Sequence, residues 1–369
     1  MPLRAIINQQ EVISSLLSDE EWDELKREVK SNGLEVIIAQ TKRPGYLRKS
    51  KLGLNHFVHQ RGQKPDNWKP ESPEHLWIKN EIILGCRDAG WKATPEFMED
   101  NWIADVLAEQ DDKRIAFEVQ WSSQTGERTL ERQEEYLKSK VRGCWFFKTP
   151  PKEYREPFSE EIKALKGLPM FRVIKNEAYE IVVLFNENEY SIRSFVCTLL
   201  QGKIKFRRNL TAKPVQTIEV TFYKHSCWKC GKLQDLYFLP GTVESKCGHD
   251  LYLSNTMWDG GDLAKDPEIV EEVKNLVDPK SNKPYQIGEV KPRFSRTVEK
   301  VYPSFGCYYC DAIFGDFFLS RERLEASNDP NNTKHNLSIN LKGVYDKDHD
   351  EFADAEAGHW CYNEEKSFC

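Results

Sequence analysis

Two carboxylates interrupt apolar stretches in residues 101–123. Asp105 stands in the run IADVL, and Glu118 stands in the run IAFEV. The polar turn QDDK between these runs predicts a hairpin in which Asp105 lies directly opposite Glu118. Directly opposed residues share a face of the sheet, with Cβ atoms about 4.5–5.5 Å apart. Gln120 shares the face of Glu118, because side chains alternate along a strand.

Two ionised carboxylates at that spacing repel each other, which destabilises a fold unless a cation lies between them. Mg²⁺, or Mn²⁺ in its place, takes hard oxygen ligands and is commonly held by one or two carboxylates and several waters. Glu74, in the first turn of a predicted helix, offers a third acid. The alternative is the solvated outer face of an antiparallel hairpin. Apolar flanks on both sides of each acid favour a sheet that is covered on both faces.

Two Cys-x-x-Cys motifs form a second group with metal-ligand spacing. Cys227 and Cys230 lie in HSCWKCGK, and Cys307 and Cys310 lie in SFGCYYCDAIFG. Two such knuckles suit one tetrahedral structural Zn²⁺. A redox dithiol is disfavoured because no thioredoxin-like strand–CxxC–helix context is present, and simple buried thiols remain an alternative. A zinc ion suits residues 223–369, where periodic apolar runs are few, because metal binding supplies folding free energy.

The elements that must position these residues can be read from start and stop signals. One helix is predicted to begin after Ser18 as its N-cap and to end at Gly33. Another is predicted in ESPEHLWIKNEIILGCRDAG, with Ser72 as its N-cap and Pro73 at the first helical position. The acidic hairpin follows, then a helix in ERTLERQEEYLKSKV and an apolar strand, CWFF.

Four segments follow from this pattern, and the expected class is α/β. Residues 1–70 form a strand and helix segment with a basic hairpin, and residues 71–157 form the core that carries the acids. Residues 158–222 are a connecting α/β segment, and residues 223–369 are a cysteine-rich, zinc-binding domain.

The order of helix, acidic hairpin, helix and strand resembles the core of the PD-(D/E)XK nuclease superfamily. Within it, residues 1 to about 150 resemble the competence protein CoiA-like nuclease family. The resemblance rests on motifs in the same order along the chain: HFVH at 56–59, ESPEHLWIK at 71–79, ADVL at 104–107, FEVQWS at 117–122, and Arg132 with Tyr136.

The resemblance implies a mixed sheet flanked by helices, with Asp105 and Glu118 binding Mg²⁺ (or Mn²⁺) and Glu74 assisting. Gln120 stands where the superfamily name has a lysine, and Glu-x-Gln is the form that the CoiA-like branch carries. Lys79 is a candidate for orienting the attacking water or supporting the phosphate, and its alternative is a surface lysine.

Arg132 and Tyr136 are one helical turn apart and could contact a phosphate. The alternative for Arg132 is an ion pair with Glu135, three residues on.

Basic residues gather in two places that could contact a nucleic-acid backbone. Arg48, Lys49 and Lys51 lie in the predicted basic hairpin, and Arg207 and Arg208 form a second patch. Each could also be an ordinary solubility charge.

Composition limits the function classes. The 369-residue chain has a net charge of −6, which argues against binding to nucleic acid by bulk charge alone. Neither a signal peptide nor a transmembrane run is expected. Ten cysteines in such a chain indicate thiols and metal rather than disulfides. We therefore expect a cytoplasmic protein with no membrane contact.

The function expected from these observations is metal-dependent phosphodiester hydrolysis, with an endonuclease and a DNA substrate favoured over RNA. The resemblance implies a role in DNA uptake or in defence against mobile elements, including viruses. The rival is a catalytically inactive nucleic-acid-binding or scaffold protein that uses its zinc knuckles. A degenerate site would be expected to lose an acid, whereas Glu74, Asp105 and Glu118 are all present. A protein partner or a homo-oligomer stays open.

Overall fold

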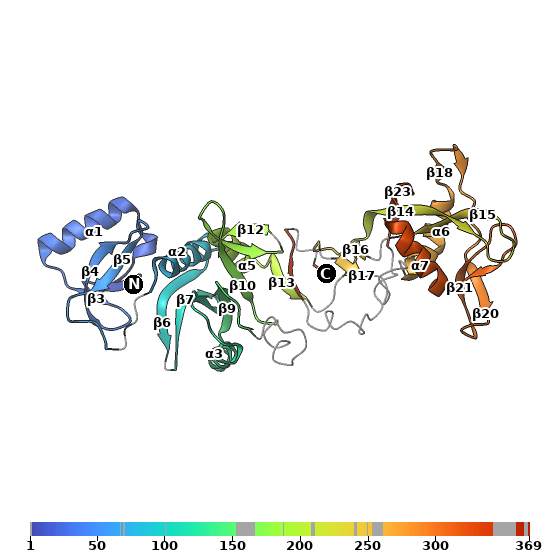
Figure 1. Cartoon of the computed structure of the whole chain (residues 1–369). Helices are drawn as coiled ribbons and strands as arrows, with labels where there is room; N and C mark the ends of the chain where they lie inside the picture. The colour runs from blue at the N-terminus through green and yellow to red at the C-terminus, as the bar shows by residue number, and fades with distance from the viewer. Residues whose placement is uncertain are drawn as a thin grey trace. The chain divides into compact units, whose positions relative to one another are not determined.

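The chain forms two compact units, each described here by itself (Figure 1). The first comprises residues 1–208 and 351–366, and the second comprises residues 209–350 and 367–369. The structure is a computed structural model. It describes residues 2–66, 68, 71–99, 101–152, 167–186, 188–207, 211–239, 242–248, 250–252, 261–341, 359–364 and 368–369.

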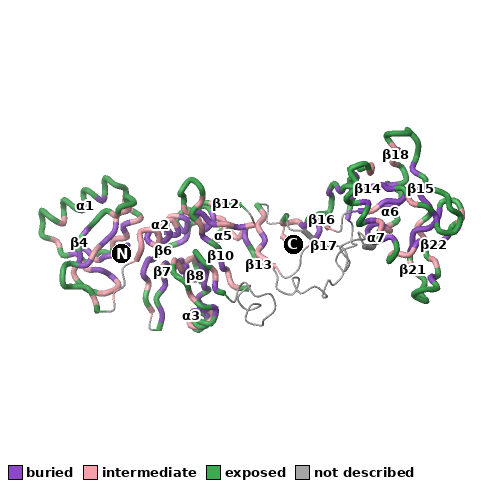
Figure 2. Tube along the Cα trace, in the orientation of Figure 1, coloured by how far each residue is buried: buried purple, intermediate pink, exposed green. Residues whose placement is uncertain are grey.

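The first unit begins with a five-stranded antiparallel sheet. Its strands are, in spatial order, β2 (Gln10–Ile13), β1 (Arg4–Ile7), β3 (Val36–Ile38), β4 (Arg43–Lys49) and β5 (Asn55–His59). The short 3₁₀ helix η1 (Ser14–Leu16) and helix α1 (Asp19–Asn32) follow β2. Helix α1 buries only Trp22, whose ring packs edge-on at 5.2 Å from Phe57, so most of the helix is exposed (Figure 2).

Helix α1 begins and ends where its sequence signals predicted. Ser18 is the N-cap and forms a capping box with Glu21, and Gly33 closes the helix in the left-handed conformation. In β5, the two histidines of HFVH are both buried. His56 Nδ1 lies 3.2 Å from the Leu54 carbonyl and His59 Nε2 lies 2.8 Å from Thr41 Oγ1, which fits structural roles.

A seven-stranded mixed sheet forms the centre of the first unit. Its strands are, in spatial order, β12 (Asn188–Ser191), β11 (Ile181–Phe185), β10 (Met170–Lys175), β9 (Arg142–Phe147), β8 (Lys113–Gln120), β7 (Trp102–Gln110) and β6 (Lys92–Glu99). β8, β9 and β10 are parallel neighbours, and the other neighbours are antiparallel. β10, β11 and β12, from the segment predicted as a connection (158–222), therefore extend the same sheet as the acidic hairpin.

Helices cover both faces of this sheet, as predicted from the apolar flanks of the acids. α2 (Pro73–Asp88) and α5 (Ile192–Leu200) pack on one face, where Phe146 is fully buried between them and the strands. α3 (Gly126–Lys138) packs on the other face, where Tyr136 lies against Trp145. The sheet is thus the middle layer of a mixed α/β fold. Beside it, β13 (Ile204–Arg207) pairs with β24 (His359–Tyr362).

The acidic hairpin has the predicted register. β7 and β8 join through a two-residue turn in which Asp111 has a φ of 51°, and Val106 pairs with Phe117. Continued by one residue, this register places Asp105 opposite Glu118. The regular ladder ends at Val106, however, and that ending decides the geometry of the site.

The second unit is built from short strands around one apolar core. A three-stranded sheet contains β15 (Leu233–Phe238), β14 (Val215–Ser226) and β23 (Thr333–Asn340), and another contains β20 (Lys291–Ser295), β21 (Lys300–Gly306) and β22 (Ile313–Phe314). The remaining elements are β16 (Thr242–Glu244), β17 (Asp250–Tyr252), η3 (Gly261–Lys265), α6 (Pro267–Lys274), β18 (Val277–Asp278), β19 (Lys283–Pro284) and α7 (Asp316–Ser327). β14 runs through the boundary predicted between residues 222 and 223. Among the helices described in both units, none is long and apolar enough to span a bilayer.

Candidate active site and metal clusters

Strand β7 of the acidic hairpin switches faces at Asp105. Ala104 packs in the core beneath α3, whereas Val106, two residues on, packs in the core beneath α2. Regular alternation would put both on one face. The neighbouring strand β6 switches at Glu96, which lies opposite and has a left-handed φ of 46°.

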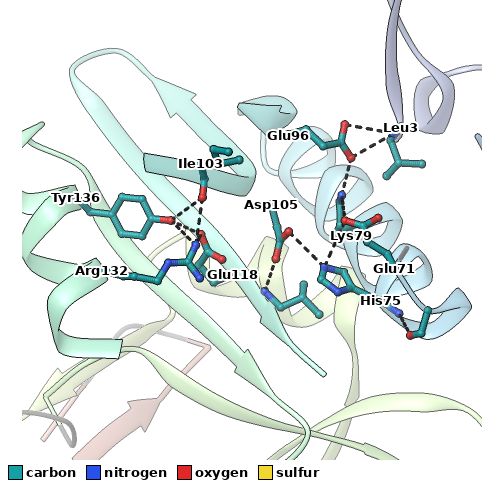
Figure 3. A network of polar contacts seen from close by, with 12 residues as sticks. Leu3, Glu71, His75, Lys79, Glu96, Ile103, Asp105, Glu118, Arg132 and Tyr136 are labelled. Atoms are coloured by element: carbon teal, nitrogen blue, oxygen red, sulfur yellow. Dashed lines mark hydrogen bonds and ion pairs between the residues drawn. The ribbon is translucent and has the colours of Figure 1, made fainter. Parts of the chain in front are cut away.

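This switch corrects the expectation that direct opposition places both acids on one face. Asp105 faces α2, where its Oδ1 lies 3.3 Å from His75 Nε2. Glu118 faces α3, where its Oε1 lies 2.7 Å from Arg132 Nη2. Figure 3 shows Asp105 between two sets of side chains. Glu118, Arg132 and Tyr136 lie on one side of it, and His75, Lys79 and Glu71 lie on the other.

Asp105 is held as a carboxylate. Its Oδ2 accepts a hydrogen bond of 2.8 Å from the backbone N–H of Val119. Burial opposes its ionisation, but His75, the more distant Lys79 and this N–H together hold the pKa of Asp105 below its ordinary value. Burial likewise opposes protonation of His75, and the charges of Asp105 and Glu71 outweigh it and raise the pKa of the imidazole.

A buried lysine links this group to the N-terminal sheet. Lys79 is fully buried, and its Nζ lies 2.5 Å from Glu96 Oε1 and 3.0 Å from Glu71 Oε1. Glu96 also accepts from the backbone N–H of Leu3, at 3.2 Å. Burial opposes the charge on Lys79, but the two glutamates raise its pKa above the ordinary value. The interpretation of Lys79 as a surface lysine was therefore wrong, because helix α2 turns this position into the core.

Glu118 has its own partners beneath α3. The hydroxyl of Tyr136 donates to Glu118, and Arg132 pairs with Glu118 rather than with Glu135, the alternative partner considered for it. Arg132 also donates to the Ile103 carbonyl at 3.1 Å, and the Tyr136 hydroxyl oxygen lies 3.2 Å from the same carbonyl oxygen. Burial and the charge of Asp105 raise the pKa of Glu118 to about 7, although Arg132 and Tyr136 oppose the shift. Tyr136 and Arg132, the two candidates for a phosphate contact, are therefore also the partners of Glu118.

Three side chains come close enough to share one ion. Ligand atoms of Glu71, His75 and Asp105 all lie within 4.8 Å of one another. Glu74 and Glu118 lie outside this group; Glu74 instead pairs with Lys175 Nζ at 3.6 Å. Glu71 and His75 were not predicted as site residues, although helical spacing puts His75 on the face of Lys79, one turn earlier.

The remaining predicted residues fall at the edges of this site or away from it. Gln120 ends β8 on the face of Glu118 and is half-buried. Arg48, Lys49 and Lys51 lie on the β4–β5 hairpin and its turn, all exposed, and Lys49 pairs with Asp19 at 3.0 Å. Arg207 is half-buried at the end of β13, and Arg208 lies outside the described residues.

A basic pocket adjoins the carboxyl ends of the parallel strands. Lys148, Thr149, Pro150 and Arg172 line a hollow of about 310 Å³. The backbone N–H of Lys148 donates to the Gln120 carbonyl at 3.0 Å, so the pocket begins one strand away from the end of β8. No motif marked these cations in the sequence.

Comparison with known proteins identifies the segment that carries this site. Residues 71–223 match the family model described as "Competence protein CoiA, nuclease-like domain". This segment is similar to the CoiA nuclease-like domain. The match confirms the resemblance to the CoiA-like family and includes Glu71, His75, Asp105 and Glu118. It spans residues 71–223 rather than 1 to about 150, so the HFVH motif at 56–59 lies outside it. No curated protein matches.

One solved structure aligns with part of the chain. It is the Pyrococcus furiosus SfsA in complex with Ca²⁺, with 15% identity, a TM-score of 0.24, and coverage of 43% of this chain and 85% of that chain. The CoiA match ends within β14, so the cysteines of the two Cys-x-x-Cys motifs lie beyond it.

The predicted cysteines converge in the second unit. The sulfurs of Cys227, Cys230, Cys307 and Cys310 lie within 4.8 Å of one another. The Sγ atoms of Cys227 and Cys310 are 3.7 Å apart, as are those of Cys230 and Cys307. Two sulfurs on a tetrahedral zinc with bonds of about 2.3 Å would lie roughly 3.8 Å apart. The four thiols therefore fit one zinc ion.

Local backbone geometry favours the thiolate of Cys227, whereas burial raises the pKa of the Cys307 thiol. Burial opposes ionisation of Cys227, but hydrogen bonds from the N–H groups of Cys230 and Lys229 lower the pKa of its thiol to about 7. Metal ligation requires the thiolate form, so these N–H groups prepare the sulfur for a cation.

Proposed function

We propose that the first unit is a metal-dependent nuclease with a PD-(D/E)XK-type core that hydrolyses phosphodiester bonds. The observation that carries the proposal is the half-buried group of Glu71, His75 and Asp105 inside the segment that matches the CoiA nuclease-like domain. An endonuclease acting on DNA is favoured, and RNA is the alternative substrate. The family description, a competence protein, fits DNA uptake, and defence against mobile elements would use the same chemistry.

Asp105 has the central role in this proposal. With Glu118 it forms the acid pair that the family resemblance implies, and with Glu71 and His75 it forms the group that the geometry brings together. When bound, Mg²⁺ or Mn²⁺ would polarise a phosphoryl oxygen and lower the pKa of a bound water. An imidazole nitrogen among the ligands makes Mn²⁺ a better fit than Mg²⁺, which prefers oxygen alone.

Other residues of the chain would hold the substrate. Arg132, at the surface of α3 beside Glu118, is placed to contact a phosphate near the acids, with Tyr136 fixing its position. Lys148 and Arg172 line the adjoining pocket and would contact the backbone further along. The exposed Arg48 and Lys51 are candidates for outer contacts.

One observation favours the rival, a catalytically inactive binding protein. His75 and Lys79 lie against Asp105 and Glu71, and Arg132 lies against Glu118, so each acid has a cationic neighbour without any metal. Such a network could be purely structural. The two functions differ in whether a divalent cation displaces these contacts.

Incubation of the purified chain with linear, circular and single-stranded DNA and with RNA, in Mg²⁺, Mn²⁺ or EDTA, tests the proposal. We expect cleavage of DNA that requires a divalent cation and is faster in Mn²⁺. Binding of nucleic acid without cleavage under every condition would support the rival.

We also propose a structural Zn²⁺ on Cys227, Cys230, Cys307 and Cys310. The tetrahedral fit of the sulfur spacings supports it. Metal analysis of the purified chain should find close to one zinc per chain, and its absence would contradict the assignment.

A further inference from the structure

The two cysteine knuckles of the second unit are equivalent in backbone geometry. In the first, the N–H of Gly231 donates to the Cys227 carbonyl at 2.9 Å, and in the second the N–H of Asp311 donates to the Cys307 carbonyl at 3.0 Å. Gly231 and Asp311 both have a left-handed φ, of 70° and 58°. The residues that follow the first cysteine of each knuckle therefore occupy matching positions.

Those matching positions both carry an exposed aromatic side chain. Trp228 is 70% exposed and Tyr308 is 54% exposed. The indole N–H of Trp228 donates to the Ile313 carbonyl at 2.9 Å, and the backbone N–H of Tyr308 donates to Gln234 Oε1 at 2.7 Å. The knuckles thus present two large rings to solvent while fixing their attachment points. Each ring follows a cysteine of the same four-thiol group, so both start from one small region.

Two exposed lysines accompany the rings, and Lys232 Nζ lies over the Tyr309 ring at 4.6 Å from its centroid. Lys229 and Lys232 are exposed, and neither forms an ion pair within the part of the chain that the structure describes. By contrast, Lys291 and Arg293 on β20 are both paired with Asp311. Two lysines without an ion pair among the described residues therefore lie at the first knuckle, beside Trp228.

We propose that the two knuckles form a binding platform for single-stranded nucleic acid. Trp228 and Tyr308 would each stack on an unpaired base, and Lys229 and Lys232 would contact the backbone phosphates. Stacking on aromatic rings accepts any base, and it needs bases that are not already stacked in a duplex. The platform rests on the proposed zinc site, which fixes the knuckles, and does not depend on cleavage by the first unit.

Binding of a fluorescently labelled oligothymidylate to the full chain tests the platform. Measurements in the Asp105→Asn background keep the probe from being consumed by the proposed nuclease. Trp228→Ala and Tyr308→Ala should each weaken binding by roughly five-fold to a hundred-fold, the range of one lost base stack. Trp228→Phe and Tyr308→Phe should retain most of the affinity. The indole emission of the parent protein should be quenched by the oligonucleotide, and less so in Trp228→Phe.

Phe317→Ala is the matched control, because Phe317 is an 84% exposed aromatic residue on α7 of the same unit and lies outside both knuckles. It should bind the oligonucleotide like the parent. The zinc-to-protein ratio of every variant shows whether the knuckles are intact, and the two phenylalanine variants test the rings where an alanine variant fails to fold.

Three outcomes would overturn the platform. Unchanged affinity in Trp228→Ala and Tyr308→Ala with zinc bound would remove the rings from the interface. An equal loss of affinity in Phe317→Ala would indicate a general apolar surface. If Trp228→Ala and Tyr308→Ala lose self-association but keep their oligonucleotide affinity, the rings contact a second copy of the chain instead. Failure of the wild-type chain to cleave DNA would contradict the nuclease proposal alone, because this experiment measures binding.

Discussion

The acidic cluster of the first unit and the cysteine cluster of the second hold their ligands by different means. Glu71, His75 and Asp105 lie on or next to elements that a large apolar core already fixes, and Lys79 and His75 compensate the acids. The four thiols lie in the turns β14–β15 and β21–β22, with Cys227 and Cys307 buried in the apolar core of the second unit. Their ligand atoms lie within 4.8 Å of one another.

This difference separates what a metal would do in each place. The first unit can fold without a cation, because its buried charges are paired within the protein, so a cation there would serve chemistry. The second unit has few long elements, so a metal would contribute to its folding. Removing metal should therefore abolish a function in one unit and destabilise the fold in the other.

Loss of one thiol should give the largest effect. Cys307→Ser leaves three sulfurs for zinc, so we expect bound zinc to fall from about one per chain to near zero. The unfolding transition of the second unit should then be lost or shifted strongly downward while that of the first unit remains. Metal analysis and calorimetry on one preparation measure both.

Cys197→Ser is the control for this change, since Cys197 is a half-exposed thiol on α5 of the first unit. It should leave zinc content and both transitions unchanged. If Cys307→Ser does not alter the unfolding transition of the second unit, that unit folds without its metal. The proposed difference between the two units would then be wrong.

Removing the buried cation Lys79 should destabilise the first unit almost as strongly. Lys79→Met leaves Glu71 and Glu96 buried without their cation, which typically destabilises a protein by about 3–5 kcal/mol. Denaturant unfolding of the first unit measures it, and adding Glu96→Gln should restore part of the loss. Lys138→Met, at an exposed position on α3, is expected to change stability by less than about 0.5 kcal/mol. Equal stability of the two single variants would contradict the buried network.

Glu71 and Glu74 are three residues apart, and their variants distinguish the ligand group that the fold brings together from the predicted one. Glu71→Gln removes a carboxylate that lies within 4.8 Å of His75 and Asp105, whereas Glu74→Gln removes one that faces Lys175. We expect Glu71→Gln to weaken Mn²⁺ binding by roughly tenfold or more, and Glu74→Gln to change it little. Calorimetric titration compares them, and the reverse order would restore Glu74 to the site.

The raised pKa of Glu118 gives a smaller, pH-dependent effect in metal-free protein. Its carboxyl has a pKa of about 7 in the fold against an ordinary 4.5. As pH rises between these values, the unfolded state loses its proton first, so the folded state becomes relatively less stable. Glu118→Gln does not titrate. Its Tm relative to wild type should therefore rise from about pH 5 to about pH 8 in EDTA; parallel Tm curves would contradict the shift.

Sequence signals predicted the local structure well where one short pattern decides it. The caps at Ser18, Gly33 and Ser72 fix helix ends within a few residues, and the Asp111–Asp112 turn fixes the hairpin register. The two Cys-x-x-Cys motifs predicted a four-thiol cluster because each knuckle positions its own sulfurs.

The acidic site was less accessible to sequence reasoning because its geometry depends on long-range packing. A regular pleat predicts that Asp105 and Glu118 share a face, and nothing local marks the switch at Asp105 and Glu96. Glu71 precedes its helix and lies in no periodic pattern, so only the fold brings it to Asp105. The bond from Leu3 to Glu96 joins residues 93 positions apart.

Asp105→Asn tests the central claim most directly, because Asp105 belongs to both the acid pair and the observed group. The change keeps the size of the side chain and removes one charge. A Mn²⁺ titration and a DNA cleavage assay on the same folded preparation should show lost metal binding and lost cleavage, while DNA binding survives. Wild-type cleavage in Asp105→Asn would contradict the assignment of this cluster as a nuclease site.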